Sequence, residues 1–446
     1  MALSKGNGAF DALGRSAHRL KGASRDFDPL LEMIGDAPFV LLGEASHGTH
    51  DFYRVRAEIT KRLIREKGFT AVAVEADWPD AYRVNRYVRG GGEDADSTDA
   101  LSGFKRFPQW MWRNADVLDF VGWLRSRDEA EEGPKVGFYG LDLYSLRTSM
   151  AAVLRFLETV DPKAAGRARD RYACFDHFGE DTQAYGYAAR YGLAPSCEDA
   201  VVEQLLDFQF SADRYLLDDG PAAADEVFFA EQNARLVANA ERYYRAMFSD
   251  RAESWNVRDR HMAETLEALA AHLSAWGSQA KVVVWAHNSH LGDARATRMG
   301  AEGELNLGQL VRQSHGTKAV LVGFTTFAGT VTAASDWDAP AERKQVRPAL
   351  RGSYEKLFHD TGLGNFFLNL RDDRALGDIL AVPRLERAIG VIYRPDTERA
   401  SHYFEARLSE QFDAVLHYDI TRAVEPLERT GLWEGGEAPE TFPSAL

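Results

Sequence analysis

Short, continuous apolar runs alternate along the chain with segments whose apolar residues recur every three to four positions. Runs of the first kind are typical of strands buried on both faces, and segments of the second kind are typical of amphipathic helices. The first elements are a strand at 39–43, a helix at 51–66, a strand at 69–74 and a helix that begins at Trp78-Pro79. This order predicts a parallel sheet with right-handed crossovers.

The later pattern predicts a long helical segment that interrupts the strands. A helix at 110–125 precedes a short strand at 136–140, and residues 145–276 show only helical patterning, which is too long for a simple crossover. Strand patterning then resumes at 282–285, with a strand or hairpin at 319–331 and strands at 366–370, 389–393 and 412–417. We therefore expect an α/β fold with a mainly parallel central sheet and a large helical insertion.

These elements suggest four parts of the chain. We expect an N-terminal leader at 1–37 with one short amphipathic helix, an α/β catalytic core at 38–146 and 277–427, a helical insertion at 147–276, and a loose C-terminal tail at 428–446. The tail is rich in glycine, glutamate and proline, and the sequence contains no internal repeat.

Composition narrows the class of protein. The 446 residues are 45% hydrophobic and 27% charged, which is ordinary for a globular chain, and the net charge of −15 disfavours a nucleic-acid partner. The two cysteines, Cys174 and Cys197, form no CxxC pair, so the sequence supports neither a zinc ribbon nor a disulfide framework. No apolar run approaches the ~18 residues of a membrane span, and no signal-peptide core is present, so we expect a cytoplasmic protein.

The first candidate site follows the strand at 39–43. Glu44 and His47 lie between this strand and the next helix, and the carboxyl ends of parallel strands are where ligands bind. The field of the helix N-terminus suits Glu44 or a nearby oxyanion, and it favours a neutral His47 that can accept a proton. The alternative is a helix cap followed by exposed polar loop residues.

The position of Arg56 favours a functional site, and not merely a helix cap, at the loop that carries Glu44 and His47. The apolar stripe of the helix at 51–66 consists of positions 52, 55, 59 and 63, and Arg56 lies inside this stripe, whereas Arg54 points away and is expected to be solvated. A charged side chain on a buried face must be paired, so Arg56 is expected to reach Glu44 or Glu75. The alternative is an arginine that extends along the edge of the core toward water.

The next strands also end at carboxylates. Glu75 and Asp77 follow the strand at 69–74, and Asp142 follows the strand at 136–140. Two carboxylates could bind a metal, orient a histidine or cap a helix. We expect a site role for Glu75, and we expect Asp77 to cap the helix that begins at Trp78.

The second candidate loop carries His287 and His290 after the strand at 282–285. Their spacing is compatible with a metal site, but it is not HExxH and no cysteine is nearby, so general acid–base or oxyanion-stabilising roles are the alternative. On the preceding helix, Asp259 falls in register with apolar positions, and we expect it to be structural, through Arg258 or a helix cap.

Two common mechanisms lack their motifs. Ser46 lies in G-x-x-S-x-G at 43–48, which is not the nucleophile elbow G-x-S-x-G. The sequence has no GxxxxGK[ST] loop, and no GxGxxG follows a strand, so a nucleotide cofactor is not expected.

Taken together, the motifs resemble those of the erythromycin esterase family. They are GEASHG at 43–48, the strand ending in Glu75, WAHNSH at 285–290, YxxNxYV at 82–88, NxRD at 256–259, SHYF at 401–404 and TRAVEP at 421–426. The resemblance covers about residues 25–425, and it implies a three-layer α/β/α fold like that of other hydrolases.

The resemblance also implies a reaction. Family members that act on macrolides hydrolyse the lactone ester, and they are generally regarded as not needing a metal; no cofactor is expected. His47 would be the general base on a water molecule, Glu44 and Glu75 would orient and polarise it, Arg56 would hold the carboxylates, and His287 and His290 would contact the ester carbonyl. Trp110, Trp112, Asn85 and Asp259 are expected to contact the substrate, and Trp255 could also line an apolar cleft.

The expected partner is therefore a small-molecule ester, possibly a macrolide lactone, with neither nucleic acid nor membrane involved. One alternative is a metal-dependent hydrolase that uses the same histidines and carboxylates. Another is a ligand-binding protein, transferase or cyclase with the same cleft and no hydrolysis.

Overall fold

The computed structural model describes residues 2–179, 181–216, 221–275, 277 and 279–435. Within these residues, nine strands form a central sheet in the order β1-β8-β11-β6-β2-β5-β3-β4, with β7 paired to β6. The strands are β1 (His18–Arg19), β2 (Phe39–Leu42), β3 (Ala71–Asp77), β4 (Gly137–Asp142), β5 (Val282–Trp285), β6 (Ala319–Ala333), β7 (Glu342–Val346), β8 (Phe366–Asn369) and β11 (Ala414–Thr421).

The strands from β11 to β4 in this order pair in parallel, whereas β1, β7 and β8 pair in antiparallel fashion. A mainly parallel α/β sheet is therefore confirmed. Strand side chains alternate between two cores: Phe39 and Leu41 of β2 pack on one face, and Val40 and Leu42 pack on the other. Helices cover both faces, as a sheet buried on two sides requires.

The longer helices divide between these faces. The face of Phe39 packs against α7 (Leu146–Val160), α8 (Pro162–Tyr172), α10 (Glu198–Tyr215), α11 (Pro221–Ala246), α12 (Arg251–Ser274), α15 (Leu307–His315), α16 (Tyr354–His359) and α17 (Arg374–Leu380). The face of Val40 packs against α2 (Asp28–Ile34), α3 (His50–Lys67), α4 (Trp78–Val88) and α6 (Ala115–Ala130). The remaining helices are α1 (Ala2–Ser16), α5 (Ser97–Leu101), α9 (Thr182–Arg190), α13 (Asn288–Leu291), α14 (Arg298–Ala301), α18 (Glu398–Ser401), α19 (Leu408–Gln411) and α20 (Gly431–Glu434).

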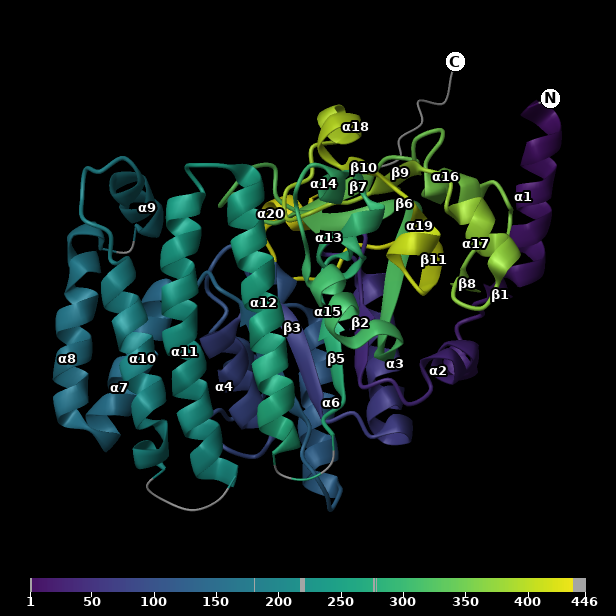
Figure 1. The fold of residues 1–446 in the computed structure, drawn as a ribbon. Helices are drawn as coiled ribbons and strands as arrows, with labels where there is room; N and C mark the ends of the chain where they lie inside the picture. Colours follow the sequence, from purple (N-terminus) through teal and green to yellow (C-terminus); the bar gives the residue numbers. More distant parts are fainter. Residues whose placement is uncertain (1, 180, 217–220, 276, 278, 436–446) are drawn as a thin grey trace.

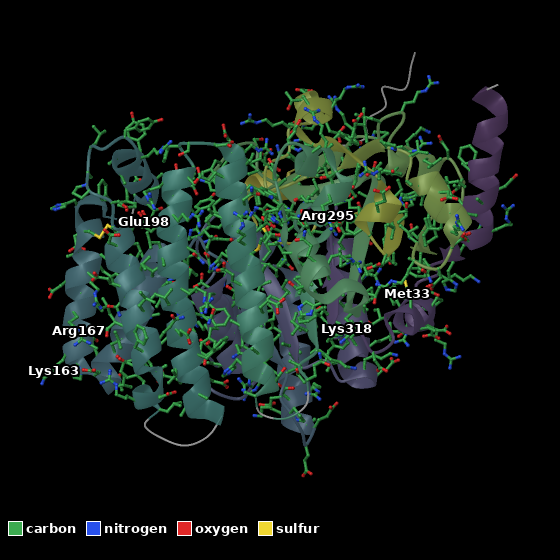
Figure 2. All side chains as sticks on the ribbon, viewed as in Figure 1. Met33, Lys163, Arg167, Glu198, Arg295 and Lys318 are labelled. Carbon is green, nitrogen blue, oxygen red and sulfur yellow. A yellow bond between two sulfur atoms is a disulfide. The ribbon has the colours of Figure 1, made fainter. Side chains whose placement is uncertain are left out.

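The helices α7 to α12 gather on one side of the molecule, as the blue to teal ribbons in Figure 1 show. They occupy the segment in which the sequence shows only helical patterning. Cys174 and Cys197 form a disulfide within this region, drawn as a yellow bond near Glu198 in Figure 2. The expectation that the cysteines form no disulfide framework is therefore wrong, because pairing depends on distance in space and not on a CxxC spacing.

This disulfide also bears on the expected compartment, since disulfides persist mainly in oxidising environments. A cytoplasmic location stays a prediction. Among the described residues, no helix is both long and apolar enough to cross a membrane.

The two ends of the chain are more ordered than the sequence suggests. The leader contains α1, α2 and the edge strand β1, which pairs with β8, in place of one short helix. In the tail, α20 buries Trp433, whose indole N–H donates to Thr332 at 2.8 Å. Residues 436–446 lie outside the described part of the chain. The four-part division itself remains a prediction.

One predicted strand is wrong. Residues 389–393 form only isolated bridges, Ser46 with Ile389 and Ala334 with Ile392. The strand at this point is β9 (Arg384–Arg387), which pairs with β10 (Tyr403–Ala406) in a separate two-stranded sheet.

Candidate active site

Two loops meet at the carboxyl ends of neighbouring parallel strands. The loop at 43–49 follows β2 and the loop at 286–290 follows β5, and Leu42 lies opposite Trp285 in the strand register. The N–H group of Asn288 donates to the carbonyl oxygen of Glu44 at 2.8 Å, which joins the loops directly. The sheet topology therefore brings together two histidine-bearing segments that are far apart in the sequence.

The turn from the first loop into α3 requires glycine. Gly48 has φ +65°, and an added Cβ would lie 2.1 Å from the carbonyl oxygen of Thr332 and 2.8 Å from the ring of Trp110. Its carbonyl oxygen accepts hydrogen bonds from the N–H groups of Thr332 at 3.0 Å and Val424 at 2.8 Å. The backbone next to His47 is thus held from two sides.

A buried chain of polar groups runs from Arg56 to His47. The Arg56 guanidinium donates to Oε2 of Glu44 at 2.8 Å, and Oε1 of Glu44 lies 2.8 Å from Nδ1 of His47. Arg56 is fully buried and pairs with Glu44, one of the two partners that its position in the helix predicted. Arg54 is exposed, as expected. A carboxylate at Nδ1 fixes the tautomer and leaves Nε2 of His47 as the proton acceptor.

His287 faces His47, with 4.9 Å between the ring centroids. The backbone N–H group of His287 donates to Glu75 at 2.9 Å. In its ring, Nδ1 accepts from the backbone N–H group of Ser289 at 3.2 Å. Burial, and then the charge of His47, lower the pKa of His287 to about 3. His287 is therefore a neutral imidazole with the proton on Nε2, which suits a hydrogen-bond donor.

His290 lies between two carboxylates. Its Nδ1 is 2.9 Å from Oδ1 of Asp259, and its Nε2 is 3.3 Å from Oε1 of Glu75. Burial and the charge of Arg258, whose guanidinium lies 3.1 Å from Nε2, lower the pKa of His290, but the charges of Asp259 and Glu75 outweigh both effects and raise it to about 9. His290 is therefore an imidazolium at neutral pH, and the ring of Trp255 stacks on it at 4.5 Å.

Arg258 completes this charged cluster. It donates to both oxygens of Asp142, at 2.9 and 2.6 Å, and to Oε1 of Glu75 at 2.7 Å. Burial alone would raise the pKa of Glu75, but His290 and Arg258 hold it well below its usual range. The sequence predicts Arg258 only as a partner for Asp259, and no signal beyond the NxRD motif at 256–259 indicates this role.

These groups open on a pocket of about 680 Å³, whose wall also carries Arg106, Tyr144, Trp255, Trp337 and Tyr403. Glu44 and Arg56 lie behind His47 and do not line it. The residues of the expected site that do line the pocket are His47, Glu75, Trp112, His287 and His290.

Three residues expected to contact the substrate do not line this pocket, and their substrate contacts stay predictions. Asn85 is buried, and its side-chain oxygen accepts a hydrogen bond from the backbone N–H group of Phe138 at 3.0 Å, which connects α4 to β4. Trp110 packs over Gly48. Asp259 is fully buried and binds His290 and the backbone N–H group of Leu307, the first residue of α15, so its charged partner is His290 and not Arg258.

Asp77 also differs from its predicted role. It occupies the N-cap position of α4, but its side chain caps no N–H group and instead accepts from Arg106 at 2.7 Å. Asp77 and Asp80 both line the pocket. Burial, and then the charge of Asp77, raise the pKa of Asp80 to about 7.

The histidine and carboxylate groups are engaged mainly with one another. Among the described residues, no three histidine, cysteine, aspartate or glutamate side chains are grouped as a metal site would require. The arrangement can hold a water molecule against a base, and it presents a neutral imidazole N–H and two cations to a developing negative charge.

A parallel α/β/α sheet whose strand ends carry a histidine–carboxylate pocket defines an enzyme of the hydrolase-like α/β class. More particularly, the chain is a hydrolase of the erythromycin esterase family, whose family model matches residues 64–421. The match begins after the first loop and includes Glu75, His287 and His290.

Individual relatives agree with this assignment. The chain is 23% identical over 417 residues to erythromycin esterase type II of Escherichia coli, which covers 88% of this chain and 92% of that protein. A solved Bacillus cereus protein has a TM-score of 0.76 at 20% identity, over 95% of this chain and 99% of that one. A mutant erythromycin esterase in its open conformation has a TM-score of 0.66 at 17% identity, over 92% and 96%. These structural similarities confirm the three-layer fold.

Proposed function

We propose that the protein hydrolyses a carboxylic ester by direct attack of water, with His47 as the general base. The observation that carries this proposal is the buried chain from Arg56 through Glu44 to His47, which ends at the pocket opposite His287. A carboxylate that orients a histidine toward a reacting group is the usual arrangement for proton transfer.

In this mechanism a water oxygen attacks the ester carbonyl carbon while Nε2 of His47 takes its proton. The tetrahedral intermediate carries an oxyanion, which the neutral N–H group of His287 stabilises by hydrogen bonding and the positive charges of His290 and Arg258 stabilise electrostatically. Collapse of the intermediate breaks the ester C–O bond, and the protonated His47 returns the proton to the leaving alkoxide.

For the substrate we propose a macrolide lactone. One support is the similarity to erythromycin esterase type II of Escherichia coli. The other is the pocket volume of about 680 Å³, which lies within the ~300–1,000 Å³ that is typical of small-molecule sites. Aromatic side chains on its wall, among them Trp112, Trp255 and Trp337, suit a large, partly apolar ring.

The test is mass spectrometry of erythromycin incubated with the wild type, with His47→Ala and with His50→Ala. His50 is a matched control because it also binds a carboxylate, Asp116 at 2.9 Å, but does not line the pocket. We expect a gain of one water, about 18 Da, with the wild type and with His50→Ala, and a rate at least ~100-fold lower with His47→Ala.

The outcomes separate the alternatives. An unchanged rate in His47→Ala would end the general-base assignment. A rate that falls on chelation and returns with a divalent ion would favour the metal-dependent alternative, and no reaction with erythromycin or simpler esters would favour a non-hydrolytic protein.

A further inference from the structure

Two acidic side chains are fully buried on the far side of the catalytic loops from α3. Glu355 lies on α16 and Glu386 on β9, and both have no exposed surface. In each, Oε2 has no hydrogen-bond partner within the described residues. Ionised carboxylates are stable in such surroundings only when they are paired, so the protonation of these two groups is a structural question.

Glu386 is connected to the second catalytic loop through Asn288. The Asn288 amide donates to Oε1 of Glu386 at 3.3 Å and to the carbonyl oxygen of Phe324 at 2.8 Å. The N–H group of Asn288 also holds the carbonyl oxygen of Glu44 at 2.8 Å. Asn288 therefore fixes the turn that separates His287 from His290.

The segment after Glu386 is connected to the first catalytic loop. The N–H group of Ile389 donates to the carbonyl oxygen of Ala45 at 2.8 Å, and the N–H group of His47 donates to the carbonyl oxygen of Ile389 at 3.0 Å. A shift of Glu386 would thus act on both loops at once.

No cation neutralises Glu386 in the described part of the chain. The neighbouring Arg387 directs its guanidinium to the carbonyl oxygens of Thr326, Phe327 and Arg347 and to Glu398. Burial, and then the charge of Glu355, raise the pKa of Glu386 to about 8. The charged, titratable or amide groups around it are Tyr354 and Glu355 on α16, Asn288 on α13, Gln411 on α19, and Arg384 and Arg387 on β9 itself.

We propose that Glu386 is a positioning residue that works as a neutral carboxylic acid and holds both catalytic loops through Asn288 and the segment 387–389. Ionisation would place a second negative charge beside Glu355 with no cation bonded to Glu386, and the carboxylate could reach water only by breaking its bond with Asn288. The active form of the enzyme is therefore the one in which Glu386 carries its proton.

The test compares kcat and KM from pH 6 to pH 9.5 in the wild type, Glu386→Gln and Glu386→Ala. Glutamine mimics the neutral acid and cannot ionise. We expect the wild-type rate to fall about tenfold per pH unit above pH 8 relative to Glu386→Gln. His290 titrates in the same range, but it is common to both proteins and cancels in the ratio. Glu386→Ala should lower kcat at every pH and leave KM nearly unchanged.

A constant ratio of wild type to Glu386→Gln across this range would overturn the proposal. If Glu386→Gln does not fold, Glu355→Gln gives the same test, because loss of that neighbouring charge should move the alkaline fall of activity to lower pH. An unmoved alkaline limb would likewise overturn it.

The proposal rests on the proposed esterase function, so a second readout needs no substrate. Because Glu386 keeps its proton in the folded state but loses it near pH 4.5 when unfolded, the wild type should lose thermal stability relative to Glu386→Gln between pH 5 and pH 8, and the difference should then level off. This trend without turnover of any ester would refute the function alone. Its absence would refute the neutral Glu386.

Discussion

Arg56 offers the sharpest test of the buried network. Removing both charges of the Arg56–Glu44 pair should lower the free energy of unfolding less than removing the charge of Arg56 alone. The Arg56 side chain is fully buried, that of Glu44 is 2% exposed, and 2.8 Å separates the guanidinium from the carboxylate. The guanidinium also lies over the rings of Tyr53 at 4.5 Å and Trp285 at 5.2 Å. Methionine fills similar space without charge, so Arg56→Met removes mainly the ion pair.

The magnitude follows from the burial of both partners. Breaking a buried pair leaves an uncompensated charge, and Arg56→Met should lower the free energy of unfolding by about 3–5 kcal/mol. Adding Glu44→Gln removes the stranded carboxylate while the amide oxygen can still bind His47. The double variant should therefore be more stable than Arg56→Met alone, by about 1–3 kcal/mol.

The assay is urea unfolding followed by circular dichroism for the wild type, both single variants and the double variant. Arg62→Met is the control on the same helix, because Arg62 pairs with Glu66 and Asp28, whose side chains are 46% and 53% exposed, and donates to the carbonyl oxygen of Ser24. Each of these exposed pairs should contribute at most about 1 kcal/mol. A double variant less stable than Arg56→Met would refute the argument that an unpaired Glu44 charge dominates the cost.

Two further predictions concern stability. Because the pKa of His290 is raised in the folded state, its protonation stabilises the fold fully below the unfolded pKa of about 6.5, and this contribution is lost as pH rises toward 9. His290→Gln removes the contacts with Asp259 and Glu75. The loss of unfolding free energy that it causes should therefore shrink between pH 6.5 and pH 9 when urea unfolding is measured across this range. Gly48→Ala should lower the free energy of unfolding by several kcal/mol in the same assay, because Gly48 has a positive φ and a Cβ there would clash. The control is Gly377→Ala on α17, where a Cβ meets nothing within 4 Å and should stabilise the helix by about 1 kcal/mol. Equal effects of the two substitutions would contradict the steric argument.

Much of the fold is accessible from the sequence because each central strand is a short apolar run with a clear end. The same reasoning located Glu44, His47, Glu75, His287 and His290, since each stands at the end of such a run, and the helical stripe placed Arg56 among them. Substrate contacts were harder to predict. Trp110 and Trp112 are only two residues apart, but they lie in and just after a short 3-10 turn that precedes α6, so helical periodicity could not show that only Trp112 reaches the pocket.

The missed role of Arg258 and the missed strand β9 share a physical cause, which is the burial of charge. A hydrophobic pattern reports which face of an element is buried, but it does not report which opposite charge lies across the gap. Arg258 reaches Asp142 and Glu75 from a helix more than a hundred positions later in the chain, and no local signal encodes that contact.

The same reasoning explains why β9 was missed. Arg-Leu-Glu-Arg at 384–387 reads as a surface segment, whereas Glu386 and Arg387 are fully buried in the structure. Burying such groups costs free energy that burying an apolar residue would not. Glu386 is bonded to the loop of His287, and Ile389, which follows the segment, is bonded to the loop of His47. Where a strand is polar in sequence and buried in the fold, a role in positioning the site accounts for its cost better than packing does, and this is the basis for assigning such a role to Glu386.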